Sequence, residues 1–186
     1  MSGLVGWKKN KRNKVQRIFI DKNPKLFKPV IPEYLREITF DHKFNKPLFL
    51  GLFTESLTSL TFGNRFNRSL IPGIFPKTLT RLTFGCEFNR SLVIGVLPDN
   101  LIELNFVHDS NFNQPFDKGV LPDSLTNLHF GYLFDQQLDI SPLINLTCLT
   151  IGSQFNQKIN KSMLPRSLTS LNFYDDYYSS DHARII

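Results

Sequence analysis

Apolar residues recur along this chain with a period of about 22 residues. The stretch LTSLTFGNRFNRSLIPGIFP begins at Leu57, and LTRLTFGCEFNRSLVIGVLP begins 22 residues later, at Leu79. A fixed period in the twenties, with Leu at the first and fourth positions, is typical of a repeat solenoid in which each repeat forms one coil. Counting that Leu as position 1, full repeats begin at Leu35, Leu57, Leu79, Leu101, Leu125 and Leu146, and a closing partial repeat begins at Leu168.

The opening of each repeat predicts a short β-strand. Apolar side chains at positions 4 and 6 alternate with mostly polar ones at positions 3 and 5, which is the pattern of a strand with one face inward. Stacked copies predict a parallel sheet on the concave side of a right-handed, leucine-rich-repeat-like coil. The inward residue at position 6 is almost always Phe: Phe40, Phe62, Phe84, Phe106, Phe130 and Phe173, with Ile151 once.

The rest of the repeat predicts turns and mostly irregular or 3₁₀ backbone on the convex side. Gly at positions 7 and 17 permits a tight turn or a close backbone approach, and Pro near position 20 needs no hydrogen-bond donor. Val107 replaces the first Gly where two extra residues are inserted, so we expect a differently shaped turn there. A second inward Phe follows the first Gly: Phe44, Phe66, Phe88, Phe112, Phe134 and Phe155.

The residue after the second Phe is Asn in five repeats and Asp in one. An amide offers donors and acceptors to the backbone of a turn, and stacked copies can bond from one coil to the next. This pattern predicts a structural ladder made of Asn45, Asn67, Asn89, Asn113, Asp135 and Asn156.

The repeat is degraded at both ends, as expected for coils that face solvent on one side. Residues 1–14 show neither helical nor strand periodicity and predict a basic, partly disordered segment or cap. The solenoid is predicted to span residues 15–178, with degenerate first and last repeats, and a tail follows over residues 179–186. The first repeat fills its apolar positions with Val15, Ile18 and Ile20.

The net charge of +6 is concentrated at the N-terminus. Residues 1–17 hold six basic residues and no acid, and the remaining 16 basic residues balance all 16 acids. This distribution disfavours a basic solenoid face for nucleic acid. The six basic residues are Lys8, Lys9, Lys11, Arg12, Lys14 and Arg17.

Other features of the composition bear on location. No run approaches the roughly 18 apolar residues of a membrane helix, and the first residues lack the apolar core of a signal peptide. We therefore expect no membrane partner and a cytoplasmic, or alternatively nuclear, protein. Cys86 and Cys148 lie three repeats apart, too far for a disulfide, and free thiols fit a reducing compartment.

The motif LxxLxFGxxFNxxLxxGxLPxxL resembles the FNIP repeat, a leucine-rich repeat with an FGxxFN motif that occurs in social amoebae and giant viruses. LTFGNRFN and LTFGCEFN match it fully, and FVHDSNFN, FGYLFD and IGSQFN match it with changes, over about residues 15–178. The resemblance implies a solenoid with stacked Phe and Asn columns. Many relatives carry an F-box, which would make them substrate-recognition arms of a ubiquitin ligase. Only residues 1–14 precede the first repeat here, so a ubiquitin role is expected to need another subunit.

The sequence contains no catalytic constellation, so we expect no enzyme, cofactor or metal. The four histidines are scattered, and His108-Asp109 supplies only two adjacent ligands, which do not make a metal site. No His neighbours Cys86 in sequence to activate it as a nucleophile.

The most promising functional surface is the outward face of the predicted sheet. Thr columns there also stack well on parallel strands without any ligand. The centre departs from that pattern and is our first candidate for a partner site, although it lacks the Trp, Tyr and multiple Arg anchors typical of hot spots. The predicted partner-binding residues are Glu37, Thr39, Ser59, Thr61, Arg81, Thr83, Glu103, Asn105, Asn127 and His129.

The leading hypothesis is a non-enzymatic module that binds a protein partner, of unknown identity, through the concave sheet face. An alternative is a homodimer formed through the solenoid ends, because open strand edges invite pairing. A less favoured alternative is a nucleic-acid contact through the basic segment Lys8–Arg17.

Overall fold

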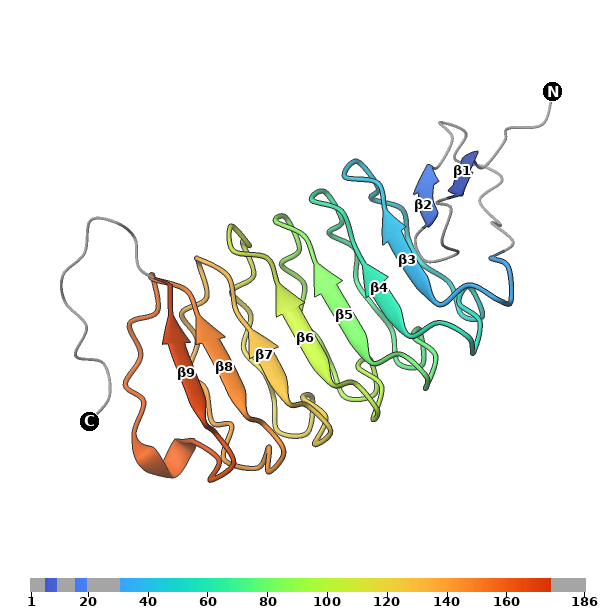
Figure 1. Ribbon diagram of the computed structural model, residues 1–186. Coiled ribbons are helices and arrows are strands. Elements are labelled where there is room, and N and C mark those ends of the chain that lie inside the picture. Colours follow the sequence, from blue (N-terminus) through green and yellow to red (C-terminus); the bar gives the residue numbers. More distant parts are fainter. Residues whose placement is uncertain (1–5, 10–15, 20–30, 175–186) are drawn as a thin grey trace.

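The computed structural model describes residues 6–9, 16–19 and 31–174. The chain forms a right-handed solenoid whose strands build one nine-stranded sheet in sequence order, with the remainder of each coil returning behind the sheet (Figure 1). We call each coil a rung and the part behind the sheet the return layer. The strands are β1 (Gly6–Lys9), β2 (Gln16–Phe19), β3 (Glu37–Phe40), β4 (Ser59–Thr61), β5 (Arg81–Phe84), β6 (Glu103–Phe106), β7 (Asn127–His129), β8 (Cys148–Ile151) and β9 (Ser170–Phe173).

The strand register confirms the alignment of the repeats. All neighbouring strands from β2 to β9 are parallel, and position 4 of each full repeat pairs with position 4 of the next, as Leu60 does with Leu82 and Leu82 with Leu104. The return layer is irregular apart from one short 3₁₀ helix, η1 (Lys161–Met163), in the part of the chain described. The predicted leucine-rich-repeat-like solenoid is therefore confirmed.

The N-terminal expectation was wrong in two respects. Residues 6–9 form β1, which pairs antiparallel with β2, where we expected no strand. In β2, Ile18 aligns with Phe40 rather than with Ile38, so the register is shifted by two residues. A shift of two residues keeps the same side chains facing inward. The shift is possible because this degenerate repeat lacks the Gly and Phe-Asn residues that fix the register of the later rungs. The predicted boundaries at residues 15 and 178, and the tail over 179–186, lie outside the described residues.

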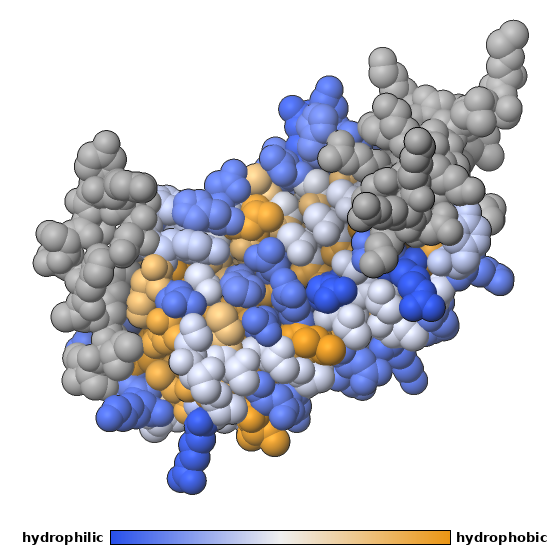
Figure 2. Space-filling model, viewed as in Figure 1, coloured by the Kyte–Doolittle hydropathy of each residue, from blue (hydrophilic) through white to orange (hydrophobic). Residues whose placement is uncertain are grey.

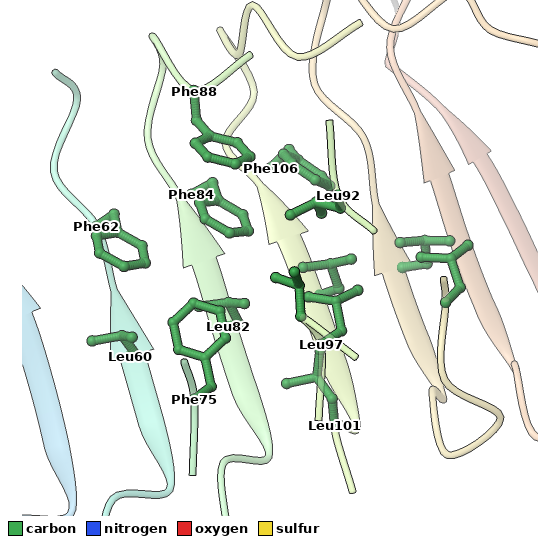
Figure 3. Close-up of a cluster of buried hydrophobic side chains, with 14 of the residues drawn as sticks. Leu60, Phe62, Phe75, Leu82, Phe84, Phe88, Leu92, Leu97, Leu101 and Phe106 are labelled. Atoms are coloured by element: carbon green, nitrogen blue, oxygen red, sulfur yellow. The ribbon is translucent and has the colours of Figure 1, made fainter. Parts of the chain in front are cut away.

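Two columns of stacked Phe rings fill the core, as predicted. Within a rung the two rings are nearly parallel, with centroids between 3.8 Å (Phe130–Phe134) and 4.1 Å (Phe40–Phe44) apart. Between rungs, Phe84 lies 5.5 Å from both Phe62 and Phe106. Figure 3 shows these rings beside the Leu side chains of positions 1 and 4. From Phe62 to Phe134, each ring thus has an aromatic neighbour in its own rung and in at least one adjacent rung, so the rungs interlock.

Gly recurs at positions 7 and 17 of the repeat for two different structural reasons. A Cβ on Gly85 would lie 2.4 Å from the carbonyl oxygen of Gly63, so position 7 requires Gly because adjacent rungs touch. Gly51 instead has a φ of +76° with open space around it, so position 17 requires Gly for backbone conformation. The inserted turn after Val107 differs as expected: it buries Ser110, whose hydroxyl accepts a hydrogen bond from the Phe112 amide at 3.1 Å.

One buried column escaped the sequence analysis. The residue directly after the second Gly packs into the core, with exposures of 3% or less. Its recurrence as an aliphatic residue was visible in the repeat, because the four members are Leu52, Ile74, Val96 and Val120.

Candidate functional site

The sheet face, which we define as the outward side chains at positions 3 and 5 of β3 to β9, is the candidate site. In β3 and β6 these side chains are partly exposed while their neighbours at positions 4 and 6 are buried, because successive residues of a strand point to opposite faces. All ten predicted residues therefore lie on one surface. Figure 2 views the molecule from this side, where polar surface covers much of the area over the strands.

The centre of the sheet face brings the predicted polar residues together. Arg81 aligns with Glu103, and Glu103 aligns with Asn127 on the following strand. Next to this row, Asn105 aligns with His129. Aligned residues on neighbouring strands are about 4.8 Å apart along the backbone. The five side chains thus form a compact patch over β5, β6 and β7, which we call the central patch.

Most of the central patch has no partner within the described part of the chain. Arg81 and Glu103 are neighbours across strands, yet neither forms an ion pair or a side-chain hydrogen bond with another described residue. Asn105 is equally free. By contrast, the Asn127 amide oxygen accepts a hydrogen bond from the Thr126 hydroxyl at 2.7 Å, and His129 Nδ1 lies 3.1 Å from the Thr150 hydroxyl. Arg81, Glu103 and Asn105 therefore add nothing visible to the sheet's own hydrogen bonding.

The Asn column is used internally. From Asn45 to Asp135, the side-chain oxygen accepts a hydrogen bond from the backbone amide at the same position of the next rung, for example from Asn67 to Asn45 and from Asn89 to Asn67, both at 3.1 Å. The ladder continues through Asn113 and Asp135 to the amide of Asn156. These residues hold rungs together, so their oxygens are not available as a ligand site.

A second ladder escaped the sequence analysis. From the repeat that begins at Leu57 onward, the residue before the first Leu donates a side-chain hydrogen bond to the preceding rung, as the Thr78 hydroxyl does to the Leu57 carbonyl at 2.8 Å. The signal was present, because this position is Ser, Thr or Asn in all repeats from Leu57 to Leu168. Its members are Ser56, Thr78, Asn100, Ser124, Asn145 and Ser167.

The turns that follow the strands hold the remaining candidates for chemistry. The Cys86 thiol donates to the Asp109 carboxylate at 3.1 Å. Partial burial, and then the hydrogen bond and negative charge of Asp109, raise the pKa of Cys86 to about 11. A thiol with so high a pKa is a poor nucleophile near neutral pH. The His108 ring packs edge-on against Tyr174, with centroids 4.7 Å apart, so His108 and Asp109 face different partners.

Other classes of site are not seen in the described ranges. Within them no group of three His, Cys, Asp or Glu residues could hold a metal ion. No helix among these residues is long and apolar enough to cross a bilayer. Both thiols are free.

A comparison with models of known protein families identifies the family of this repeat. The FNIP Repeat family model matches overlapping segments at residues 44–87, 66–109, 88–132, 112–143 and 144–176. The chain belongs to the FNIP repeat family. The FGxxFN resemblance seen in the sequence is thereby confirmed. No curated protein sequence matches the chain.

A solved structure shares the fold of this FNIP repeat protein. CroV588 of the giant virus CroV, described as a novel circular LRR protein structure, is 41% identical over 77% of this chain, with a TM-score of 0.73. The match covers 21% of the CroV588 chain. The present chain therefore spans about one fifth of that relative.

Proposed function

We propose that this protein is a non-enzymatic FNIP leucine-rich-repeat module that binds a protein partner through the central patch of its sheet face. The FNIP fold supports the coarse part of this proposal, since rigid repeat solenoids commonly offer extended surfaces to other proteins. The sequence offered no catalytic constellation, and the one reactive side chain in the described turns, Cys86, has a raised pKa that disfavours a nucleophilic role.

One observation carries the proposal to particular residues. Arg81 and Glu103 form an adjacent pair of opposite charges at a position where β4 and β9 carry Ser, and Asn105 stands at a position where four rungs carry Thr. The side chains of these three residues form no hydrogen bonds or ion pairs with described residues. Side chains that have no partner among the described residues are free to pair with charges on another protein. Their central location lets a partner contact several strands at once.

The proposal is tested with the double variant Arg81→Ser/Glu103→Ser. Both changes install the residue that β4 and β9 already carry at this position, so the fold is expected to tolerate them. We expect partner binding, measured by quantitative mass spectrometry after affinity purification, to fall about tenfold or more, which corresponds to about 1.4 kcal/mol. The purification starts from cells in which the protein is naturally made.

A matched control removes the same charges elsewhere. Glu55→Ser/Lys77→Ser deletes one exposed acid and one exposed base away from the sheet face and is expected to leave binding unchanged. Equal retention of the same proteins by both variants would refute the sheet-face site. Thermal unfolding of each variant establishes that the fold is intact.

A second candidate function is self-association through the solenoid ends. In β9, Leu171 and Phe173 are only partly buried, whereas their counterparts Leu104 and Phe106 are fully buried. β9 also pairs with a single neighbour, β8, in the described sheet. An open strand edge with half-covered apolar residues favours pairing with another chain.

A further inference from the structure

The return layer differs between the two halves of the solenoid. The residue after each Asn of the ladder is basic in the rungs of β3, β4 and β5, where it is Lys46, Arg68 or Arg90. In the rungs of β6, β7 and β8 the same position is Gln. The uncharged members are Gln114, Gln136 and Gln157.

The charge at this position is not needed for the fold. Gln114 and Gln136 donate to the ladder oxygen of the preceding rung at 3.0 and 2.9 Å. Arg68 donates through Nε to the Asn45 carbonyl at 3.1 Å, and Arg90 does so to Asn67 at 3.3 Å. Both residue types therefore bind the preceding rung through one nitrogen. The terminal guanidinium nitrogens of the two arginines have no partner in the described part of the chain.

An exposed apolar ridge runs along the same three rungs. Leu50 is 60% exposed, Ile71 and Val93 are each 47% exposed, and Ile94 is 64% exposed. Successive rungs of the ridge lie close together: a Cβ placed on Gly73 would be 3.9 Å from Leu50, and one on Gly95 would be 3.4 Å from Pro72, which is also exposed.

The ridge ends at the rung of β6. There Val93 and Ile94 are succeeded at the equivalent positions by Asp117 and Lys118. Both changes, from basic residue to Gln and from apolar to charged residues, thus occur at the same boundary between rungs. The apolar ridge consists of Leu50, Ile71, Pro72, Val93 and Ile94.

The basic row and the ridge form one amphipathic surface. They are three to four residues apart along an extended chain, which is about 10 Å. No acid occurs in the segments 46–50, 68–72 and 90–94 that contain them. Contiguous exposed aliphatic groups usually mark an interaction site. Cations that flank protruding apolar side chains are the pattern by which peripheral proteins engage anionic bilayers.

We propose that this surface docks on an anionic phospholipid bilayer. Lys46, Arg68 and Arg90 bind the headgroup phosphates, and the ridge residues enter the interface between headgroups and acyl chains. The expectation of no membrane partner rested on the lack of a spanning segment, and docking of this kind requires none. The contact uses the return layer and leaves the sheet face open, so it does not depend on the proposed partner site.

The decisive experiment is co-sedimentation of the full chain with phosphatidylcholine vesicles that contain or lack phosphatidylserine. The variant Val93→Asp/Ile94→Lys copies the residues of the next rung and leaves the net charge unchanged. We expect it to lose most binding to the anionic vesicles. Binding equal to that of the unmodified chain would overturn the proposal, because it would show attachment through another region, such as the basic residues 1–30.

A second pair of variants tests the basic row. Arg68→Gln/Arg90→Gln installs the residues of the C-terminal rungs, and we expect about 25-fold weaker binding, at about fivefold for each cation. Lys158→Gln/Lys161→Gln removes the same charge from the return layer of β8. Those lysines are three rungs from the end of the apolar ridge, farther than the roughly 8–10 Å over which charges interact strongly in physiological salt. We therefore expect their removal to weaken vesicle binding less than about threefold. Equal losses from both pairs, or no binding of the unmodified chain to anionic vesicles, would overturn the proposal.

Discussion

At the scale of single residues, the repeat is constrained by contacts between identical positions of adjacent rungs. The ladder oxygen needs only to accept a hydrogen bond from a backbone amide, which explains why Asp135 replaces Asn without breaking the series. Its bond to the Asn156 amide is 2.7 Å long, the shortest in the ladder. A carboxylate acceptor is expected to give a shorter, charge-assisted bond.

Glycine substitutions separate the two constraints on the turns. Gly85→Ala places a methyl group against the backbone of Gly63, which cannot move without displacing a whole rung. We expect the free energy of unfolding to fall by about 3 kcal/mol, the upper end of the range typical of overpacking, or slightly more. Gly51→Ala meets no atom within 4 Å and costs only the left-handed conformation, about 1–2 kcal/mol. Urea unfolding measures both values, and equal losses would contradict the assignment of close approach to position 7.

At the scale of elements, the strands are too short to be stable alone. β4 and β7 have three residues each, and most of their support comes from the Phe columns and ladders of neighbouring rungs. The second Phe column is complete from Phe44 to Phe155, whereas the first accepts Ile151. The second column is therefore the less tolerant of substitution among the rungs described.

The same chemical change at a stacked Phe and at a Phe outside the two columns tests how much the ring stacking contributes to stability. Phe88 is fully buried and stacks on Phe84 at 3.9 Å and on Phe66 and Phe112 at 6.0 Å. Phe88→Leu is expected to cost about 1–3 kcal/mol, because each lost ring pair contributes about 0.5–1.5 kcal/mol beyond area burial. Phe116 lies in a third column, at the position where four other rungs have Leu. It is only partly buried, and its contacts with the rings of Phe112, Phe130 and Phe134 are tilted rather than stacked. Phe116→Leu is therefore expected to cost less than Phe88→Leu, about 1 kcal/mol. Chemical denaturation of both variants gives the comparison, and a reversed order would refute the stacking argument.

At the scale of the whole molecule, the solenoid has distinct ends and distinct halves. β1 closes one end of the sheet in antiparallel orientation, while β9 forms the last described strand at the other end. The return layer carries a basic row and an exposed apolar ridge up to the rung of β5, and it carries Gln and charged residues at these positions in the rung of β6. A partner bound to the sheet face and a bilayer bound to the return layer can therefore be accommodated together.

The open strand edge predicts self-association. We expect the molar mass from light scattering to rise above the 21.5 kDa of one chain as protein concentration increases. The rise should persist at high salt, because strand pairing and the apolar residues Leu171 and Phe173 are insensitive to screening. A constant mass of one chain across the concentration series would exclude association through the ends.

The sequence by itself determined strands β3 to β9, both Phe columns and the Asn ladder. Each of these features joins the same position of successive repeats, about 22 residues apart, so the pattern of one repeat predicts the contacts of all internal rungs. The resemblance to the FNIP family was also visible in the sequence, in the motif FGxxFN, and the family model confirms it. Even the features that were missed, such as the ladder through Thr78 and the aliphatic column through Ile74, were recurrent in the sequence.

Only the tertiary structure decided the features that are not periodic. The pairing of β1 and the shifted register of β2 depend on an end that lacks the repeat motif. Three further features depend on side-chain directions and on the distance between particular rungs. They are the lack of an ion pair between Arg81 and Glu103, the hydrogen bond of Cys86 to Asp109, and the close approach of position 7 to the backbone of the preceding rung. Periodicity places residues on a face, but it does not fix those distances, because they result from the packing of neighbouring rungs against one another.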